Sequence, residues 1–543
     1  MKNSIFSVPT PVNEPVLSYA PGSAERAAIK AELAKQASEV IKIPLVIGGE
    51  EIHMPTPKVK CTMPHDHAHV LAEYSVAGQA ELKQAVEAAV AAKAAWQNMP
   101  WEHRAAIFLK AADLIAGPYR ALINAATMLG QSKTVYQAEI DSACEFADFL
   151  RFNVHFAQEI FKDQPINAPG FWNRMEYRPL SGFVLAISPF NFTAIGGNLP
   201  TAPAIMGNTV VWKPASTAVL SNYYIMRILR EAGLPNGVIN FVPCRGKDVS
   251  EQIIADPRMA GVHFTGSTGV FSDIWRSVGE NITKYENYPR LVGETGGKDF
   301  IFAHNTTPPA QLVTAMVRGA FEYQGQKCSA ASRAYVPESL WPCVKEQLLA
   351  EVVKLRVGDV RDFRNFMGAV IDENAFKSIT GYIDYARDSK DAEILCGSYD
   401  SSKGWFIQPT VILAKKPDFK TMVEEIFGPV LTIYVYPDSQ FDAALESCKT
   451  VSPYALTGAI FSADRNVLAH MERELADAAG NFYINDKPTG AVVGQQPFGG
   501  GRASGTNDKA GSILNLLRWT SPRTIKETFV PPVQVEYPFM LEE

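Results

Sequence analysis

The chain has 543 residues, 47% of them hydrophobic, and at roughly 100 to 200 residues per domain it should form two to four domains with large cores. Its 51 basic and 57 acidic residues leave a formal net charge of -6, and no basic run carries interleaved aromatics, which excludes nucleic acid as an expected partner. No apolar segment reaches the roughly 18 residues of a membrane span, and the first residues resemble neither a signal peptide nor a transit sequence. We therefore expect no membrane partner and a cytoplasmic location, or the mitochondrial matrix if a transit peptide has been removed.

The order of predicted elements indicates an α/β protein. Residues 79–161 are Ala-rich with apolar positions at helical spacing, which predicts several amphipathic helices. From residue 181, the runs GFVLAIS, NTVVWKP, GVINFVP and GVHFTGS alternate with helical segments, the rhythm of a parallel sheet. After ETGGK at 294 a second set begins with DFIFAH, a helix over 309–323 and SRAYVP, and continues with FIQPTVIL and VLTIYVY. Two α/β domains should therefore meet near residue 294.

The cysteines and histidines predict neither a disulfide framework nor a metal site. The seven cysteines are an odd number without a CxxC pair, which favours a reducing compartment. The densest cluster of possible ligands is CTMPHDHAH, residues 61–69, but its histidines follow a proline in a polar stretch. We expect this segment to be a solvated loop.

A dinucleotide site is indicated without the usual GxGxxG motif. FTGSTG, residues 264–269, ends an apolar run in Gly266 and Ser267, whose amides and hydroxyl suit a pyrophosphate at a helix N-terminus. An ordinary strand-to-helix turn uses the same residues. Lys213 ends VVWKP, and ligands of open α/β sheets bind beyond the carboxyl ends of strands, although a solvated lysine would look the same.

Cys328, in YQGQKCSAAS, is the candidate nucleophile. A free thiol is largely protonated at neutral pH, so a catalytic cysteine needs a base or nearby dipoles. Three other segments supply suitable groups: SPFNF contributes the amide of Asn191, ETGGK the carboxylate of Glu294, and EEIFGPV the acceptor Glu425 with the flat ring of Phe427. Together these groups are suited to acyl chemistry beside a nicotinamide.

The segments SPFNF, WKPAS, FTGST, ETGGK, GQKCSA, EEIFGPV and PFGGGRASG occur in this order over more than half of the chain, and together they resemble the aldehyde dehydrogenase superfamily. The resemblance implies a two-domain α/β fold: a Rossmann-like NAD-binding domain over 1–161 and 183–293, a catalytic domain over 294–521, and a β-flap for oligomerisation over 162–182 and 522–543.

The resemblance also implies a mechanism. The Cys328 thiolate attacks the aldehyde, and the Asn191 amide and the Cys328 N–H stabilise the oxyanion. Hydride transfer to NAD leaves a thioester, and Glu294 activates the water that hydrolyses it. The implied cofactor-binding residues are Ser188, Lys213, Ser216, Gly266, Ser267, Glu425 and Phe427. Many NAD-preferring members have a glutamate where this chain has Ser216, which leaves weaker use of NADP open.

ETGGKDF, GQKCSAASRAYVP, GQQPFGGGRASGTNDKAG and LLRWTSP resemble the subfamily that oxidises L-glutamate γ-semialdehyde, formed from Δ1-pyrroline-5-carboxylate, to L-glutamate. Its substrate carries a carboxylate and an ammonium, and a buried carboxylate needs several donors. The resemblance implies that Ser329, Gly511 and Ser512 bind the carboxylate. It also implies that Phe192 and Trp519 sandwich the aliphatic stem and that Glu145 meets the ammonium.

This reaction is the second step of proline catabolism, and the chain has no room for a fused proline dehydrogenase barrel of about 200 residues or more. We expect a separate enzyme, a homodimer or higher homo-oligomer, functionally coupled to proline dehydrogenase. Two alternatives stay open: a dehydrogenase for another semialdehyde or an aliphatic aldehyde, and a non-catalytic structural descendant of the fold. Intact Cys328, Glu294 and Asn191 argue against the latter.

Overall fold

The computed structural model describes residues 4–55 and 58–542, which form two α/β units and a projecting two-stranded ribbon. The first unit is built on a seven-stranded sheet in the order β11-β10-β7-β8-β9-β2-β3. Five strands run parallel and β2 and β3 are antiparallel additions. The strands are β2 (Leu45–Ile47), β3 (Glu50–Ile52), β7 (Phe183–Ile187), β8 (Thr209–Lys213), β9 (Ile239–Phe241), β10 (Met259–Thr265) and β11 (Arg290–Glu294).

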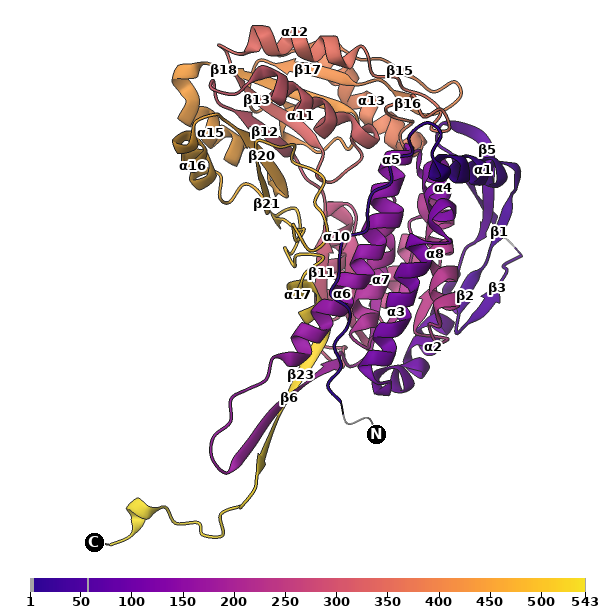
Figure 1. Ribbon diagram of the computed structural model, residues 1–543, viewed down its shortest axis with the longest axis vertical. Coiled ribbons are helices and arrows are strands. Elements are labelled where there is room, and N and C mark those ends of the chain that lie inside the picture. Colours follow the sequence, from indigo (N-terminus) through magenta and orange to yellow (C-terminus); the bar gives the residue numbers. More distant parts are fainter. Residues whose placement is uncertain (1–3, 56–57, 543) are drawn as a thin grey trace.

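Helices cover both faces of this sheet, and the strands are accordingly continuous apolar runs. Figure 1 shows α3, α6, α7 and α8 as one packed layer of the first unit. The helices are α2 (Gln79–Asn98), α3 (Trp101–Ala116), α4 (Arg120–Gln131), α5 (Val135–Ala138), α6 (Phe146–Lys162), α7 (Thr193–Ile205), α8 (Val219–Ala232), α9 (Gly246–Val249) and α10 (Thr268–Glu280). A π-helical segment, Glu139–Glu145, joins α5 to α6.

The second unit contains a seven-stranded sheet in the order β14-β17-β18-β13-β12-β20-β21, parallel except for the edge pair β14 and β17. Its strands are β12 (Asp299–Ala303), β13 (Ala331–Pro337), β14 (Ala392–Cys396), β17 (Thr410–Ala414), β18 (Val430–Tyr436), β20 (Thr457–Phe461) and β21 (Asn481–Ile484). Its helices are α11 (Pro309–Phe321), α12 (Trp341–Val352), α13 (Glu373–Asp388), α14 (Lys420–Val423), α15 (Phe441–Thr450) and α16 (Arg465–Glu474). The predicted α/β class is confirmed.

The chain passes from the first unit to the second near residue 294 and returns to the first unit near residue 513. β11 ends at Glu294 and β12 begins at Asp299, where ETGGK predicts the change of domain. Near the C-terminus, α17 (Ile513–Leu517) returns to pack on α6 of the first unit. The last part of the range 294–521 therefore lies against the first unit.

The ribbon consists of β6 (Phe171–Pro179) and β23 (Thr520–Thr528), paired antiparallel and projecting from the first unit (Figure 1). A three-stranded sheet of β1 (Ile41–Ile43), β5 (Asp66–Ser75) and β4 (Lys58–Met63) lies beside α1 (Ala24–Ser38). Short pairs complete the fold: β15 (Tyr399–Asp400) with β16 (Phe406–Ile407), and β19 (Tyr454–Ala455) with β22 (Gly501–Arg502). No helix in the described ranges has the length and apolar character needed to cross a membrane.

The expectation of a solvated loop over residues 61–69 is wrong. Cys61 and Met63 end β4 with buried side chains, and β5 begins at Asp66, so the segment is the turn of an antiparallel pair. The polar residues misled the prediction because they have separate partners: His65 Nδ1 lies 3.1 Å from Ser132 Oγ, and His69 Nε2 lies 2.8 Å from the Ala37 carbonyl.

Candidate active site

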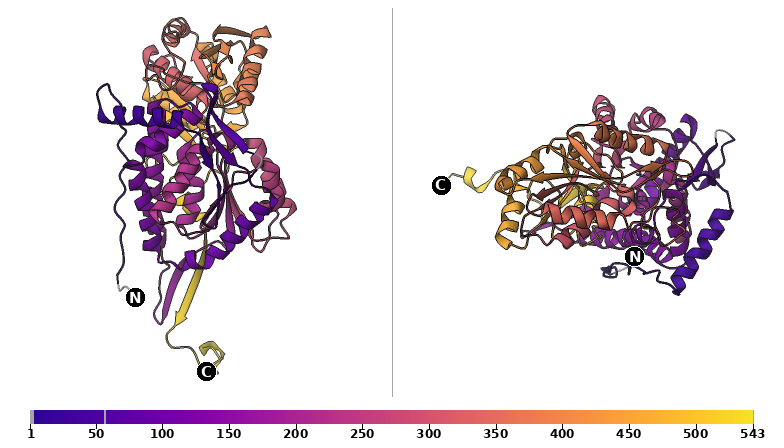
Figure 2. Two further views of the ribbon diagram at one scale, coloured as in Figure 1. Left: turned by 90° about the vertical axis from the view of Figure 1, so that its right-hand side faces the viewer. Right: turned by 90° about the horizontal axis from the view of Figure 1, so that it is seen from above.

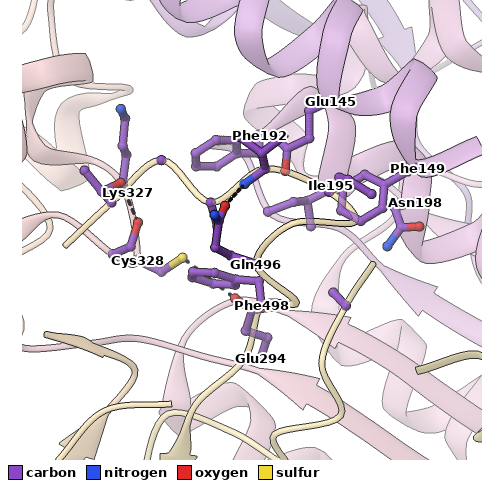
Figure 3. Close-up of a pocket in the computed structure, with 18 of the residues that line it drawn as sticks. Glu145, Phe149, Phe192, Ile195, Asn198, Glu294, Lys327, Cys328, Gln496 and Phe498 are labelled. Carbon is purple, nitrogen blue, oxygen red and sulfur yellow. Dashed lines mark hydrogen bonds between the residues drawn. The ribbon is translucent and has the colours of Figure 1, made fainter. Parts of the chain in front are cut away.

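A cavity of about 680 Å³ lies where the two units meet, and it is lined by Cys328, Glu294 and Ser329 together with residues of α6, α7 and the segment 487–500. Figure 3 shows Cys328 and Lys327 at one end of this cavity and Phe149 and Asn198 at the other. The sequence-predicted residues Glu145 and Phe192 also line it. The cavity is elongated, with the thiol at one end.

Cys328 lies in the turn that leads from α11 into β13, and this turn is strained and firmly held. Tyr323 and Gln324 adopt left-handed φ values of 51° and 57°, which side chains other than glycine rarely adopt. The Gln324 amide compensates by donating to the Ser132 carbonyl at 2.9 Å and to the Ala369 carbonyl at 2.7 Å. These hydrogen bonds fix the approach of the turn to the first unit and hence the place of the thiol.

Glu294 is the acidic group nearest to this thiol, with Cys328 Sγ 3.9 Å from Glu294 Oε1. Burial raises the pKa of Glu294 to about 8, although Lys509 opposes the shift. Burial, and after it the Glu294 carboxylate, raises the pKa of the Cys328 thiol. Both groups therefore hold their protons at neutral pH, and a base is needed before the sulfur can attack.

Asn191 follows β7 and reaches the same turn. Its Nδ2 donates to the Gln326 carbonyl at 3.1 Å, which leaves one amide hydrogen for another acceptor. The next residue, Phe192, is the N-cap of α7. The structure thus brings Asn191 to the turn that contains Cys328.

A buried ion pair between Lys133 and Asp141 stabilises the start of α7, next to Phe192. Asp141 accepts hydrogen bonds from the N–H groups of Thr193 (2.9 Å) and Ala194 (2.8 Å), at the start of α7. Lys133 Nζ pairs with the same carboxylate at 2.7 Å and lies 4.0 Å from the centre of the Phe192 ring. Nothing in the sequence indicated this pair, because its members lie far from the recognisable motifs.

Several of the predicted cofactor residues lie along the carboxyl edge of the first sheet. Lys213 ends β8, and Gly266 and Ser267 precede α10, whose N-terminus is capped by the Ser267 hydroxyl. Among the described residues, Lys213 Nζ has a single hydrogen-bond contact, 3.5 Å from the Pro214 carbonyl, and burial lowers the pKa of this lysine. An ammonium so poorly satisfied fits ribose or phosphate oxygens, so these residues fit a dinucleotide.

Ser188 and Ser216 also follow strands of this sheet, but their contacts indicate cofactor binding less clearly. The Ser188 hydroxyl donates to the Gly196 carbonyl at 3.0 Å and accepts from Trp212 Nε1 at 2.7 Å, so it is used within the fold. Ser216 begins a short 3-10 turn directly after β8.

Glu425 and Phe427 come from the second unit. Glu425 accepts a hydrogen bond from the Gly297 N–H at 2.9 Å, within ETGGK. Phe427 packs edge-on against Phe190 of SPFNF, with ring centres 5.8 Å apart. The contact joins two segments that the sequence placed in different domains.

Three of the predicted substrate residues do not border the cavity. Trp519 is fully buried against His263, with ring centres 4.7 Å apart, and its Nε1 donates to Asn515. The Ser512 hydroxyl caps α17, accepting from the Leu514 N–H at 3.2 Å and donating to the Lys509 carbonyl at 2.6 Å. Gly511 precedes this cap and lies behind Val493 and Phe149. The prediction of these three residues as substrate contacts is corrected accordingly.

The corresponding positions on the cavity wall are Gly490 and Phe498, which the sequence reading missed. Thr489, next to Gly490, shares a 2.7 Å hydrogen bond with Ser329, the residue after Cys328. Lys487 Nζ donates to the Thr489 carbonyl at 3.1 Å and lies directly beside Gly490. In the described part of the chain, the N–H groups of Gly490 and Ala491 donate no hydrogen bond. This corner therefore offers a cation, a hydroxyl and two free amides to an anion.

The opposite part of the cavity is acidic. Glu145 lies at the end of the π-helical segment, and Asp148 lies one turn further along, in α6. Burial, and after it the Asp141 carboxylate, raises the pKa of Glu145. The lining thus carries basic side chains and, elsewhere, a carboxyl whose raised pKa favours the protonated form until a cation binds beside it.

Fold and site define a class of enzyme: a two-unit α/β protein with a dinucleotide edge and a buried cysteine–glutamate pair between the units. Comparison with known proteins agrees. The model of the aldehyde dehydrogenase family matches residues 53–525. The chain belongs to this family, and the predicted family is confirmed.

Comparison with individual proteins is more specific than the match to the family. The chain is 56% identical over 540 residues to a mitochondrial Delta-1-pyrroline-5-carboxylate dehydrogenase of Dictyostelium discoideum, covering 99% of this chain and 97% of the relative. It matches the crystal structure of a Delta-pyrroline-5-carboxylate dehydrogenase from Mycobacterium tuberculosis bound with NAD at 53% identity and TM-score 0.97, over 100% of both chains. Proline utilization A from Bdellovibrio bacteriovorus matches at 30% identity and TM-score 0.91, over 97% of this chain and 54% of that one.

Proposed function

We propose that this enzyme oxidises L-glutamate γ-semialdehyde to L-glutamate with NAD. The observation that carries the proposal is the arrangement of basic and acidic side chains around the cavity. An anion-binding corner of Ser329, Gly490 and Lys487 adjoins the nucleophile, and the acidic Glu145 lies on another wall. An aldehyde that carries a carboxylate and an ammonium is complementary to both groups. The relatives named as Delta-1-pyrroline-5-carboxylate dehydrogenases support the same substrate.

The chemistry follows from the residues at the base of the cavity. Cys328 loses its proton, through Glu294 or a water molecule, and the sulfur adds to the aldehyde carbon. The Asn191 amide and the Cys328 N–H stabilise the oxyanion, each donor contributing about 3 kcal/mol in comparable acyl chemistry. NAD, when bound, supplies the acceptor for the hydride that leaves this carbon. The thioester that remains on Cys328 is hydrolysed by a water molecule that Glu294 deprotonates, releasing glutamate.

The cofactor is held, in this proposal, by Lys213, Ser216, Gly266 and Ser267 at the sheet edge and by Glu425 and Phe427 from the second unit. The Mycobacterium tuberculosis structure, bound with NAD, supports this cofactor. Substrate contacts are assigned to Ser329, Gly490, Ala491 and Lys487 for the carboxylate. Phe192 and Phe498 are assigned to the stem and Glu145 to the ammonium.

The remaining proposals concern the whole molecule. Residues 1–161 and 183–293 form the NAD-binding domain, the range from 294 the catalytic domain, and β6 with β23 the flap through which copies associate. Exposed Trp172, Phe529 and Val530 on the flap support a homo-oligomer. The likeness to proline utilization A supports coupling to proline dehydrogenase. The Dictyostelium relative is named as mitochondrial, which supports the matrix beside the cytoplasm as a location.

A direct test is product analysis with L-glutamate γ-semialdehyde. The proposal requires glutamate and NADH in equal amounts, and a Lys487→Met variant with a raised KM for this aldehyde but an unchanged KM for NAD. NADH formation without glutamate, or an unchanged aldehyde KM in the variant, would contradict the proposed substrate or its anion corner respectively.

A further inference from the structure

Residues 8–20 form an extended segment, here called the N-terminal strap, that runs along the helical layer of the first unit toward α1 (Figures 1 and 2). Hydrogen bonds fasten it along its length. The Val8 N–H donates to Gln158 Oε1 at 2.7 Å, Arg120 Nη2 donates to the Pro15 carbonyl at 2.7 Å, and the Tyr19 hydroxyl donates to Glu139 Oε2 at 2.7 Å. Such a well-fastened strap has a fixed path beside the cavity, which Asn13, Glu14 and Val16 help to line.

Asn13 links the strap to α6 and to the segment that contains Val493 and Gln495. Its Nδ2 donates to the Val493 carbonyl at 2.8 Å and to Asp148 Oδ2 at 2.8 Å. Its Oδ1 accepts from Gln495 Nε2 at 2.9 Å. The Glu14 N–H donates to the second oxygen of Asp148 at 2.7 Å. One amide therefore ties α6, through Asp148, to the segment that contains Val493 and Gln495.

That segment is the substrate loop, residues 489–496, and it is held at three points. Thr489 shares its hydrogen bond with Ser329 at the inner end. Gly494, at φ +81°, packs so closely on Phe152 that a Cβ there would lie 2.2 Å from the ring. Asn13 holds the carbonyl and side chain on either side of Gly494. Between these points lie Gly490 and Ala491, which line the cavity and whose N–H groups donate no hydrogen bond within the described part of the chain.

We propose that Asn13 is a positioning residue for substrate selection: by holding Val493 and Gln495, it keeps the Gly490 and Ala491 amides where the substrate carboxylate binds. The strap thus completes the specificity site from a part of the chain remote in sequence. This inference rests on the proposed function, because it matters only for an aldehyde with a carboxylate. An aldehyde without that group does not use the two amides.

Two variants test the role. Asn13→Ala removes all three hydrogen bonds, and Asn13→Asp keeps the acceptor for Gln495 but loses both donors and faces the Asp148 carboxylate. Each should raise KM for L-glutamate γ-semialdehyde by about tenfold and leave kcat within about twofold. For propanal, kcat/KM should stay within about twofold of the wild type. The dissociation constant of L-glutamate, measured by calorimetry, should rise in step with the KM.

The control is Asn305→Ala, which removes an exposed amide that donates to Asp438 in the second unit. It should leave KM and kcat unchanged for both aldehydes. Unchanged KM in both Asn13 variants, or equal losses on both aldehydes, would overturn the positioning role. If the wild type itself shows equal kcat/KM for the two aldehydes, the proposed function fails and the inference fails with it. If the wild type prefers L-glutamate γ-semialdehyde but both Asn13 variants keep its KM, only the positioning role of Asn13 is excluded.

Discussion

Cys328 Sγ lies 3.9 Å from Glu294 Oε1, although 33 residues separate them and they come from the two different units. The carboxyl is the only acidic group in contact with the thiol among the hydrogen bonds of the described residues. Burial raises the pKa of Glu294 to about 8 and also raises the pKa of the thiol. The pair is therefore uncharged at rest, and its chemistry depends on pH.

Thioester hydrolysis should follow the ionisation of Glu294. A general base acts only when deprotonated, so with a raised pKa of about 8 the hydrolysis rate should rise about tenfold per pH unit below that value and level off above it. Single-turnover decay of the acyl-enzyme between pH 6 and 9.5 measures this rate. Glu294→Gln should lose this inflection and slow hydrolysis by roughly 10²- to 10⁴-fold. A variant with the wild-type pH profile would exclude Glu294 as the base.

Cys328→Ala should abolish aldehyde oxidation, because it removes the thiol that is assigned to form the thioester. The dissociation constant of NAD, measured by calorimetry, should stay within about twofold, since the assigned cofactor residues are untouched. Retention of more than a few per cent of the rate would remove Cys328 from its role. Cys448→Ala, at a buried thiol remote from the cavity, serves as the matched control.

Lys133→Met should destabilise the fold and disturb Phe192 at once. The substitution leaves Asp141 as an unpaired buried carboxylate, and breaking such a pair costs about 3 to 5 kcal/mol of unfolding free energy. Denaturant unfolding measures the loss. Lys162→Met, which removes an exposed pair with Glu159, should cost less than about 0.5 kcal/mol. Equal effects of the two substitutions would show that the buried pair has no special role.

Phe498→Ala and Ser512→Ala test which residue contacts the substrate. Phe498 lines the cavity in the structure, and Ser512 was predicted from the sequence. The first should raise KM for L-glutamate γ-semialdehyde severalfold, because an aromatic surface at the cavity is lost. The second should leave KM unchanged and lower stability by about 1 kcal/mol, through the lost cap of α17. The reverse pattern in steady-state kinetics and thermal melting would restore Ser512 as a substrate contact.

The sequence predicted the α/β class, and it singled out Cys328 and Glu294, which the structure brings into contact, because each feature is encoded locally. The strands are apolar runs that need no distant information, and Cys328 and Glu294 stand in short segments of small residues that serve their chemistry. The sequence analysis names Gly511 and Trp519, whereas Gly490 and Phe498 line the cavity, although both pairs combine a glycine with an aromatic at the same spacing. Which pair faces the cavity depends on how the chain returns to α6, and no local pattern encodes that path.

The contacts of Lys133 and Asn13 escaped prediction for the same reason. Lys133 acts through Asp141 on the start of α7, and Asn13 reaches Val493 across almost the whole chain length. A single sequence gives no sign of such distant pairs, since each partner looks like an ordinary polar residue. Only the folded arrangement shows that both support the walls of one cavity.

The most direct test of the proposed function is kcat/KM for NADH formation with L-glutamate γ-semialdehyde, succinate semialdehyde and propanal, measured at one pH with NAD and then with NADP. The anion corner and the acidic wall together predict a preference for the first aldehyde of about two orders of magnitude or more, since each satisfied charge contributes about 1.5 to 3 kcal/mol. Comparable values for all three aldehydes would contradict the assigned substrate and leave a general aldehyde dehydrogenase.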